Sequence, residues 1–504
     1  MGTPVFDNDR YLAEQTEAIL ERMSEVGGKL YLEFGGKLLF DFHAARVLPG
    51  FDPNIKMKLL ERISEQTEII LCVYAGDIER RKVRGDFGIT YDADTTKLID
   101  DLRTRGLEVR AVVITRFDGQ PSAEAFIQKL RNRGIQVVTH RSIPGYPADT
   151  ERVVSEEGYG SNPFVETDAP LVVVNAPGPN SGKMATCLSQ VYHEHQRGTP
   201  AGYAKFETFP IWSLPLRHPV NAAYEAATAE LRDVNMIDPY HLEAYDERAV
   251  NYNRDIEAFP LLRRILTRIT GDSMYRSPTD MGVNRAGFAI TDDEGAQDAA
   301  KSEIVRRYFR YACDEALGLS DRASVRRIEA LMEEFGVRPE DRSVVLSARE
   351  AAGRMERRGG NGHRGVFSGA AIELPDGRVV TGHNSSLMHA SAALVLNAIK
   401  ALADVPPHLD LISPPVIESI AALRKDILEL GSISLNLEDT LLALSVSATT
   451  NPLAHQAMQK LPALRSCELH LSHLPTPGDE RGLRRLGVRL TCDPKFATDK
   501  LFVS

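Results

Sequence analysis

Cysteine is scarce in this sequence, and its spacing excludes the common cysteine-based sites. The 504 residues contain five cysteines, which stand singly and form no CxxC pair. Such spacing supports neither a disulfide framework nor a cysteine zinc site. We therefore expect reduced thiols in a reducing compartment.

Long hydrophobic runs and an excess of positive charge are also absent. No apolar run comes near the ~18 residues of a membrane-spanning helix. The amino terminus lacks the apolar core of a secretory signal, and Phe6 stands where a myristoylation signal has Ser or Thr. Asp and Glu outnumber Lys and Arg by 70 to 60, which disfavours nucleic acid and anionic membranes as partners. We expect a cytoplasmic protein.

The composition is otherwise that of a folded protein with several domains. Hydrophobic residues make up 43% of the chain and charged residues 26%, which leaves little room for disorder. A chain of this length exceeds a single hydrophobic core. Changes of pattern predict three domains: an α/β phosphate-binding domain at 1–205, an α-rich region at 206–356 and an α/β domain at 357–504.

The first predicted domain has the alternation of strands and helices that is typical of a parallel sheet. Apolar strands are expected at 68–74, 110–115, 135–139 and 171–175, with helices near 55–65, 95–106 and 121–133. Continuous apolar strands between amphipathic helices indicate a Rossmann-like sheet covered on both faces. Ahead of them, the alternation of residues 30–42 around Gly35-Gly36 predicts a β-hairpin.

Helices dominate the middle of the chain and frame its last domain. They are predicted near 222–232, 254–270 and through 298–356. In the last domain, a turn at 375–377 joins two strands, and an apolar helix follows at 386–402.

This last domain faintly resembles the layout of nucleoside deaminases. That class requires a zinc-binding His or Cys followed by Ala-Glu, and then PCxxC. Here Ser391 replaces the glutamate, and residues 414–418 lack both thiolates. We therefore expect no zinc motif and interpret His389 as a packed core histidine within the helix.

The segment with the most chemistry follows the strand at 171–175. The chain runs into a loop of Pro, Gly and Asn, and Gly182-Lys183 opens an amphipathic helix. Unpaired amides at a helix start attract anions, and glycine lets a phosphate approach the backbone. The pattern predicts a P-loop-like site for a nucleotide such as ATP or another phosphorylated small molecule. The expected binding residues are Gly178, Asn180, Ser181, Gly182, Lys183, Thr186 and Lys205.

This loop departs from the Walker A motif, which is GxxxxGK followed by Ser or Thr. Gly178 and Gly182 are one residue too close, and Met184 takes the place of the magnesium-binding hydroxyl. Thr186 would supply that hydroxyl to Mg²⁺ only with altered geometry. The alternative interpretation is a tight strand-to-helix turn with a solvated Lys183.

Basic residues on other loops after predicted strands favour an anion site. Ligands of open parallel sheets bind beyond the carboxyl ends of the strands. The residues expected there are Arg80, Arg81, Lys82, Arg84, Arg116, His140 and Arg141. With Lys183 and Lys205 they would form a cationic mouth, although loops are charged in most proteins.

Longer strings across nearly the whole chain carry a family resemblance. They include KLYLEFGGKLLFDFHAARVLPGFDPN, APGPNSGKMATCLSQVYHEH and SPTDMGVN. These strings resemble the bacterial family called domain of unknown function 1846. The resemblance implies no established activity, although some members carry an ATP-dependent zinc peptidase label. Asn180 stands where many relatives have glycine.

The residues do not support zinc proteolysis. A zincin requires HExxH, whereas Arg197 takes the place of the second histidine here. His193 and His195 lie about 200° apart around a regular helix and cannot hold one ion. We interpret His195 as a packed core histidine.

A second candidate group lies in the middle of the chain. Asp238 and His241 have the spacing at which a carboxylate and an imidazole share a helix face and hold a metal ion. The alternative is that Asp238 is an N-cap residue with Pro239 at N1. His218 lies with Trp212 in a proline-rich loop that suits a substrate platform, a subunit contact or interdomain packing.

These patterns lead to three functional hypotheses. The first is an enzyme of phosphoryl transfer or hydrolysis, with Asp238, His241 and His218 as candidate catalytic residues. Lys205, Glu207, Arg217 or His218 would complete the site from the next segment. The second is a nucleotide-binding sensor or scaffold without catalysis, which fits Met184. The third is a metal-dependent hydrolase that uses Asp238 and His241. We also expect a homo-oligomer.

Overall fold

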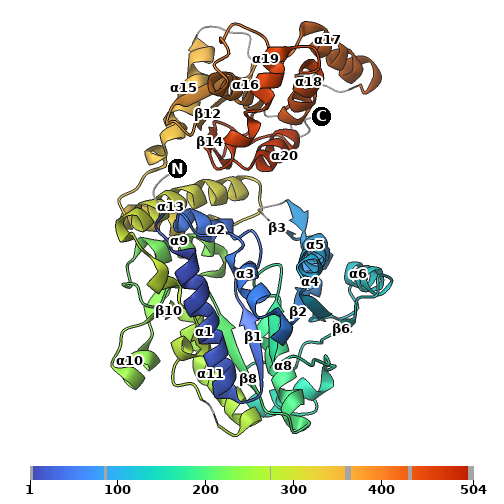
Figure 1. The fold of residues 1–504 in the computed structure, drawn as a ribbon, viewed down its shortest axis with the longest axis vertical. Helices are drawn as coiled ribbons and strands as arrows, with labels where there is room; N and C mark the ends of the chain where they lie inside the picture. The colour runs from blue at the N-terminus through green and yellow to red at the C-terminus, as the bar shows by residue number, and fades with distance from the viewer. Residues whose placement is uncertain (1–3, 85–87, 273, 358–364, 430–433, 498–504) are drawn as a thin grey trace. The chain divides into compact units, whose positions relative to one another are not determined.

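The computed structural model describes residues 4–84, 88–272, 274–357, 365–429 and 434–497 (Figure 1). The chain divides into two compact units, one up to Ala300 and one from Lys301 onward. Helix α13 (Asp293–Ala316) crosses this division. The predicted boundaries near 205 and 356 do not coincide with it and stay a prediction.

The first unit is built on a parallel sheet of seven strands in the order β11-β8-β1-β7-β2-β5-β6. The strands are β1 (Lys29–Phe34), β2 (Thr67–Tyr74), β5 (Glu108–Thr115), β6 (Val137–Thr139), β7 (Leu171–Asn175), β8 (Ala201–Phe206) and β11 (Gly282–Val283). All four predicted strands are confirmed. Their runs of Val, Ile and Leu are buried on both faces, as a parallel sheet requires.

Helices cover this sheet. Helices α8 (Lys183–Gln196) and α11 (Asn253–Thr270) share one core with the side chains of Tyr31, Val172 and Val174, which project from the same face. Helices α1 (Asn8–Val26), α3 (Ile55–Arg62), α5 (Tyr91–Thr104) and α6 (Pro121–Arg131) also belong to this unit, and the last three lie at the predicted places.

The predicted β-hairpin at 30–42 is wrong. Strand β1 ends at Phe34, Gly36 turns the chain with φ at +69°, and helix α2 (Phe42–Val47) follows. Strand β1 pairs in parallel with β7 on one side and β8 on the other. Because both edges of β1 are occupied, its alternating residues have no free edge on which a hairpin partner can form.

Short elements join the sheet to its helices. They are α4 (Ala75–Glu79), β3 (Val83–Arg84), β4 (Ile89–Thr90), α7 (Thr150–Val153), α9 (Pro219–Ala227), β9 (Asn235–Ile237), α10 (Pro239–Tyr245), β10 (Val250–Tyr252) and α12 (Pro278–Met281). Helices α9 and α11 confirm two predicted segments.

The second unit contains a sheet of four strands in the order β13-β12-β14-β15. Strands β12 (Gly369–Glu373) and β13 (Val379–His383) form the predicted antiparallel pair around Gly377, whose φ is +82°. Strands β14 (Glu468–Leu471) and β15 (Arg489–Cys492) are parallel. The helices are α14 (Arg322–Glu334), α15 (Ser343–Arg357), α16 (Ala390–Leu402), α17 (Pro414–Ala422), α18 (Leu437–Ser447), α19 (Pro452–Met458) and α20 (Pro477–Leu486). The deaminase likeness of this unit stays a prediction.

His389 does not lie within the apolar helix as predicted. It is the N-cap residue of α16, and its side chain is 27% exposed. Its Nδ1 lies 2.7 Å from Oδ2 of the buried Asp479. The helix begins one residue later because the backbone of His389 is extended.

Candidate functional site

The loop between β7 and α8 requires glycine at two places. Gly182 has φ at +88°, and a Cβ atom there would lie 2.9 Å from Thr115. A Cβ atom on Gly178 would lie 2.2 Å from the hydroxyl oxygen of Tyr91. Any larger residue at either position meets a neighbouring side chain, and at 182 it also meets backbone strain. These contacts fix the path of the loop.

The loop is held in place through its carbonyl groups. Thr115 donates a hydrogen bond of 2.7 Å to the carbonyl of Ser181, and the Arg116 guanidinium donates to the carbonyl of Asn180. The Ser181 hydroxyl donates to the carbonyl of Gly178 at 2.9 Å. Arg116 also lies over the ring of Tyr74. The end of β5, Arg116 and the loop's own Ser181 therefore hold the loop through its carbonyl acceptors rather than through its amide donors.

The amides of the same loop are left without protein acceptors. The first amide in α8 that donates to a protein group is that of Thr186, which bonds the Gly182 carbonyl at 3.0 Å. Among the described residues, no side chain caps the helix, and the amides of Asn180 through Ala185 find no protein acceptor. Their positive ends are available to an anionic ligand.

Lys183 faces the sheet rather than bulk water. Its side chain is 13% exposed, and its Nζ lies 4.0 Å from Oε1 of Glu33 on β1. Glu33 in turn accepts a hydrogen bond of 2.7 Å from the Tyr203 hydroxyl. Lys183 is therefore not the solvated lysine of the alternative interpretation.

Lys205, Glu207 and Asp255 form a charged group beside Glu33. Lys205 pairs with Glu33 in the strand register, and its Nζ lies 2.8 Å from Asp255 and 3.4 Å from Glu207. Burial lowers the pKa of Lys205, but the surrounding carboxylates outweigh burial and raise it above its usual value. Lys205 is therefore a permanent cation.

Within this group, Glu207 has a pKa close to physiological pH. Burial raises the pKa of Glu207 to about 7, with Lys205 opposing the shift and Asp255 and Glu33 adding to it. Its side chain keeps 29% exposure. A Cβ atom on Gly35 would lie 2.8 Å from Cγ of Glu207, so the glycine makes room for this side chain. A carboxyl that titrates near neutrality and remains accessible is suited to proton transfer.

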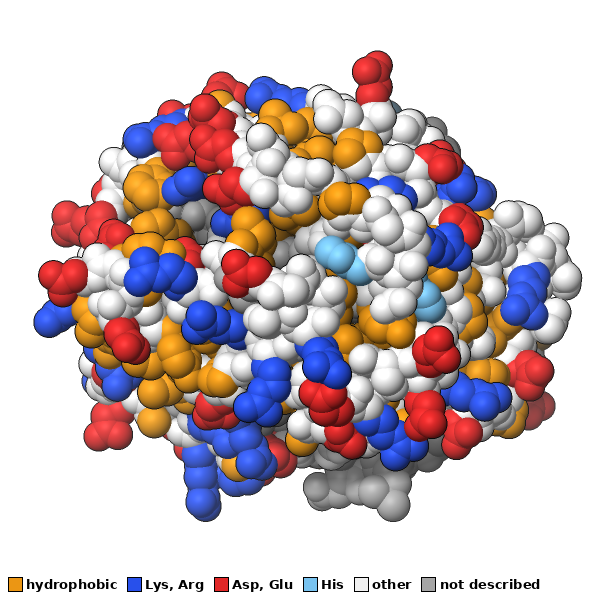
Figure 2. Space-filling model, turned by 90° about the horizontal axis from the view of Figure 1, so that it is seen from below, with side chains coloured by type: hydrophobic (Ala, Val, Ile, Leu, Met, Phe, Trp, Pro, Cys, Tyr) orange, Lys and Arg blue, Asp and Glu red, His pale blue; other side chains and the backbone are white. Residues whose placement is uncertain are grey.

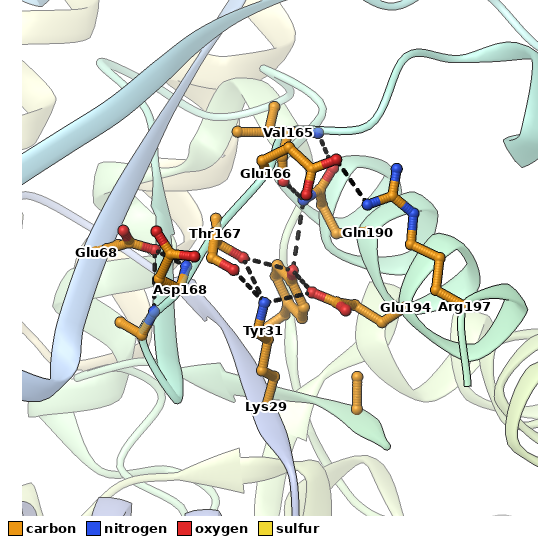
Figure 3. A network of polar contacts seen from close by, with 12 residues as sticks. Lys29, Tyr31, Glu68, Val165, Glu166, Thr167, Asp168, Gln190, Glu194 and Arg197 are labelled. Carbon is orange, nitrogen blue, oxygen red and sulfur yellow. Dashed lines mark hydrogen bonds and ion pairs between the residues drawn. The ribbon is translucent and has the colours of Figure 1, made fainter. Parts of the chain in front are cut away.

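A buried polar network anchors the far end of α8 to β1 (Figure 3). Glu194 lies 2.8 Å from the ammonium of Lys29 and accepts a hydrogen bond of 2.8 Å from the Tyr31 hydroxyl. Gln190 binds both the amide and the carbonyl of Val165. Because its second half is fixed in this way, α8 keeps its first residue, Lys183, close to Glu33 at the carboxyl end of β1.

The histidines around Glu194 serve the same anchoring. His193 Nε2 lies 2.8 Å from the Asn162 carbonyl, whereas His195 Nε2 lies 2.9 Å from the Ala201 carbonyl. The two rings therefore bind different segments. Among the described residues, no group of three or more His, Cys, Asp or Glu side chains is arranged to hold a metal ion.

Comparisons with known proteins identify the family. Residues 4–336 match the N-terminal part of the domain of unknown function DUF1846, and residues 340–502 match its C-terminal part. The chain belongs to the DUF1846 family. The UPF0371 protein of Clostridium tetani is 53% identical to it over 99% of both chains. A UPF0371 protein of Clostridium botulinum strain Alaska E43 is 54% identical over the same shares.

Of the residues expected to bind the phosphate ligand, Lys205 lies near the loop, whereas Thr186 lies in the core. Lys205 lies in the charged group described above, close to Lys183 through Glu33. Thr186 is fully buried, and its hydroxyl lies 3.4 Å from the Cys72 sulfur in the core. Since this hydroxyl lies in the core against Cys72, we leave Thr186 out of the proposed site.

The residues expected to be catalytic lie in other contacts. Oδ1 of Asp238 accepts the amides of Tyr240 and His241, and Oδ2 accepts both the amide and the hydroxyl of Thr279. Asp238 is thus the N-cap residue of α10, the alternative drawn from the sequence. His241 bonds Ser277 through Nδ1 at 2.9 Å. Within the described part of the chain, neither residue contacts the loop at 176–183 through a hydrogen bond or ion pair.

His218 caps a different helix. Its Nδ1 accepts the Val220 amide at 3.2 Å at the start of α9, and its Nε2 lies 3.0 Å from Asp293. The structure therefore brings together the loop, Lys183, Lys205 and Glu207, but it gives Asp238, His241 and His218 contacts elsewhere.

The predicted cationic mouth is smaller than expected. Burial lowers the pKa of His140 to about 4, so this ring is neutral at physiological pH. Arg84 binds Asp94 through both carboxylate oxygens at 2.8 and 2.9 Å. Of these residues, Arg116 contacts the loop between β7 and α8, because its guanidinium donates a hydrogen bond to the Asn180 carbonyl. Figure 2, which views the molecule from below relative to Figure 1, shows basic and acidic side chains interspersed on that face.

Sequence reasoning did not identify Glu33, Asp255 and Asn175. Asn175 ends β7 and is 1% exposed; its Nδ2 binds the carbonyl of Phe34, while its Oδ1 has no donor among the described residues. Asn175 also lines a small cavity with Ala176 and Pro177. The sequence signal that could have identified Asn175 and Glu33 is a polar residue at or near the end of an apolar strand.

No helix of the described chain is long and apolar enough to span a bilayer.

Proposed function

We propose that this protein binds a phosphorylated small molecule or nucleotide at the loop between β7 and α8 and catalyses phosphoryl transfer or hydrolysis. The observation that supports this proposal is the row of amides from Asn180 to Ala185, which have no protein acceptor among the described residues, in a segment that includes the largely buried Lys183. Oriented amides and a fixed cation stabilise the negative charge of a phosphate.

The neighbouring residues have distinct roles in this proposal. Lys183 neutralises the bound phosphate, and the Glu33 carboxylate keeps its ammonium oriented. Glu207, whose pKa is about 7, accepts a proton from the attacking hydroxyl group or water. Lys205 is held by Asp255 and steadies the ionised form of Glu207.

A non-catalytic sensor is the second candidate, and one observation favours it. Met184 follows Lys183 where a P-loop has its magnesium-binding hydroxyl, and the hydroxyl of Thr186 is turned into the core. Without that hydroxyl, the loop would bind phosphate while positioning Mg²⁺ weakly. Binding without turnover would then report the presence of a ligand.

Thermal unfolding with candidate ligands tests the proposal. Inorganic phosphate, sugar phosphates and nucleotides would be screened with and without Mg²⁺ on the wild type and on Lys183→Ala. A ligand at 100 times its dissociation constant adds about 2.7 kcal/mol of stability, which is a clear shift. Lys129→Ala removes a lysine on the exposed face of α6 and serves as the matched control.

The two candidate functions differ in one further measurement. Release of inorganic phosphate or transfer of the phosphoryl group by the wild type supports the enzyme. Binding that depends on Lys183 but gives no product supports the sensor. A set of phosphorylated compounds that shifts neither protein, or shifts both equally, would contradict phosphate binding at this loop.

A further inference from the structure

We propose that the ligand of this site is a monophosphate ester that carries several hydroxyl groups, such as a sugar phosphate, rather than a nucleoside triphosphate. The inference rests on the proposed function, because it concerns the same loop. It follows from the charges and the hydrogen-bonding groups that surround the phosphate position.

The buried charges beside the loop leave little capacity for a highly charged ligand. Three carboxylates, those of Glu33, Glu207 and Asp255, lie with two ammonium groups, those of Lys183 and Lys205. Arg254, which pairs with Asp233, adds one charge of each sign. The buried group therefore carries a formal charge of about −1, or 0 when Glu207 is protonated, and the exposed Arg116 guanidinium at the loop adds one positive charge.

A triphosphate would bring about four negative charges into this group, whereas a monoester brings about two. The unpaired amides and Lys183 match the smaller charge. The loop also lacks the hydroxyl that would hold Mg²⁺ against a triphosphate, since Met184 follows Lys183 and Thr186 faces the core. Both features favour the monoester.

The acidic groups are suited to hydroxyl recognition. A carboxylate accepts hydrogen bonds from two hydroxyl groups at once, and protonated Glu207 can also donate one. The side chains of Asp255 and Glu207 are 14% and 29% exposed, so neither is fully buried beside Lys205. Asn175 Oδ1, which lies at the base of the same loop, is a further acceptor without a donor among the described residues.

Competitive binding distinguishes this ligand from its alternatives. Glucose 6-phosphate, adenosine monophosphate, ATP with Mg²⁺ and inorganic phosphate would be titrated calorimetrically into the wild type. We expect the sugar phosphate to bind at least tenfold tighter than both inorganic phosphate and ATP. Comparison of adenosine monophosphate with glucose 6-phosphate shows whether the site recognises the hydroxyl groups of a ribose or those of a free sugar.

Two variants test the role of the carboxylates. Asp255→Asn and Glu207→Gln keep side-chain size but remove a hydrogen-bond acceptor and a charge. Each should lower the affinity for the sugar phosphate at least fivefold. Inorganic phosphate should bind at least as tightly as to the wild type, and ATP should bind more tightly, because one negative charge is removed. Tighter binding of ATP than of any monoester by the wild type would overturn the inference and leave the proposed function intact. Loss of all phosphate binding would instead refute the proposed function.

The second unit carries an independent feature, a pair of thiols. The sulfur atoms of Cys313 on α13 and Cys492 on β15 lie 3.4 Å apart, and Cys313 Sγ lies 3.2 Å from the Cys492 carbonyl. Cys313 is buried, whereas Cys492 is partly exposed. Both belong to the unit that begins at Lys301, and α13 continues into the first unit.

We infer that a hydroperoxide such as H₂O₂ converts this pair into a reversible disulfide. The Cys492 thiol gives up its proton and its sulfur attacks one peroxide oxygen. The O–O bond breaks, and the departing hydroxide takes up a proton and leaves as water. The Cys313 sulfur then displaces the hydroxyl group of the Cys492 sulfenic acid, which takes the proton of the Cys313 thiol and leaves as a second water. Two thiols are oxidised and one peroxide is reduced. Cys492 reacts first because it is partly exposed whereas Cys313 is buried, and the hydrogen bond to Cys492 and burial also raise the pKa of Cys313.

Mass spectrometry of the full-length protein tests the disulfide. After peroxide treatment and alkylation in denaturant, we expect two of the five thiols to be protected and a cross-linked peptide to join residues 313 and 492. Dithiothreitol should restore both thiols. Cys313→Ser and Cys492→Ser should lose the cross-link, whereas Cys467→Ser should retain it. Alkylation of all five thiols, or sulfinic acid on Cys492 without a cross-link, would overturn the inference.

Discussion

Lys183 and Glu33 face each other at the carboxyl edge of the parallel sheet, with 4.0 Å between Nζ and Oε1. One residue opens helix α8 and the other nearly ends strand β1. The pair joins the loop with unpaired amides to the charged group around Lys205. Because both side chains are largely buried, the position of the ammonium is set by the fold.

Removal of the Lys183 charge should weaken phosphate binding by about 10- to 100-fold, since a charge-assisted hydrogen bond contributes about 1.5–3 kcal/mol. Lys183→Ala tests this by calorimetric titration of the tightest phosphorylated ligand. Lys183→Arg keeps the charge and should recover part of the affinity. Equal affinity in the wild type and Lys183→Ala would show that this ammonium does not contact the ligand.

Gly182→Ala should destabilise the first unit by about 2 kcal/mol or more. The residue has φ at +88°, which strains alanine, and its Cβ would lie 2.9 Å from Thr115. Gly271 has φ at +84° but no atom within 4 Å of such a Cβ. Gly271→Ala therefore reports the strain alone, about 1 kcal/mol. Urea unfolding of both variants separates the two effects, and equal losses would exclude a role for Thr115.

Glu207 should make stability depend on pH near neutrality. Its pKa is raised from 4.5 to about 7 on folding, so the folded state binds the proton more tightly. Its contribution is fully present below about pH 4.5 and is lost as pH rises through 7. Relative to Glu207→Gln, the wild type should lose about 1–3 kcal/mol of stability between pH 5 and 8. Parallel stability curves for the two proteins would contradict the raised pKa.

The same carboxyl should control turnover. If Glu207 accepts a proton during catalysis, kcat/KM should rise with pH through about 7 and then level off. Glu207→Gln should abolish this limb and lower kcat by about 10²- to 10⁴-fold. A pH profile that is unchanged in the variant would assign proton transfer to another group. Initial-rate assays in buffers from pH 5 to 9 measure both kcat and kcat/KM.

Asp479 should be a structural residue of the second unit. It accepts hydrogen bonds from His389, Ser391, Thr476 and the amide of Leu437. Burial raises its pKa, but these partners outweigh burial and lower it, so its contribution is lost as pH falls through the folded pKa. Asp479→Ala leaves buried donors unpaired and should cost about 3 kcal/mol or more. Glu418→Ala, on the exposed side of α17, should cost less than about 0.5 kcal/mol.

Local patterns carried the prediction of the parallel sheet and of the glycine loop. Strands such as 171–175 contain continuous apolar runs rich in β-branched residues, and the helices between them have amphipathic spacing, so short-range sequence defines both. The same reasoning failed at 30–42, where alternating residues suggested a hairpin. Pairing partners are chosen across the whole unit, and β7 and β8 occupy both edges of β1.

The sequence by itself determined the order of the elements, the glycines of the loop and the lysine at the start of α8, because these depend on residues adjacent in the chain. Only the tertiary structure decided that Glu33 faces that lysine and that Lys205, Glu207 and Asp255 form a charged group beside Glu33, since these residues come from two strands, the segment after β8 and a distant helix. It also placed Asp238 as a helix cap and turned Thr186 into the core. Side-chain direction and burial depend on which surfaces meet, and long-range packing settles that choice.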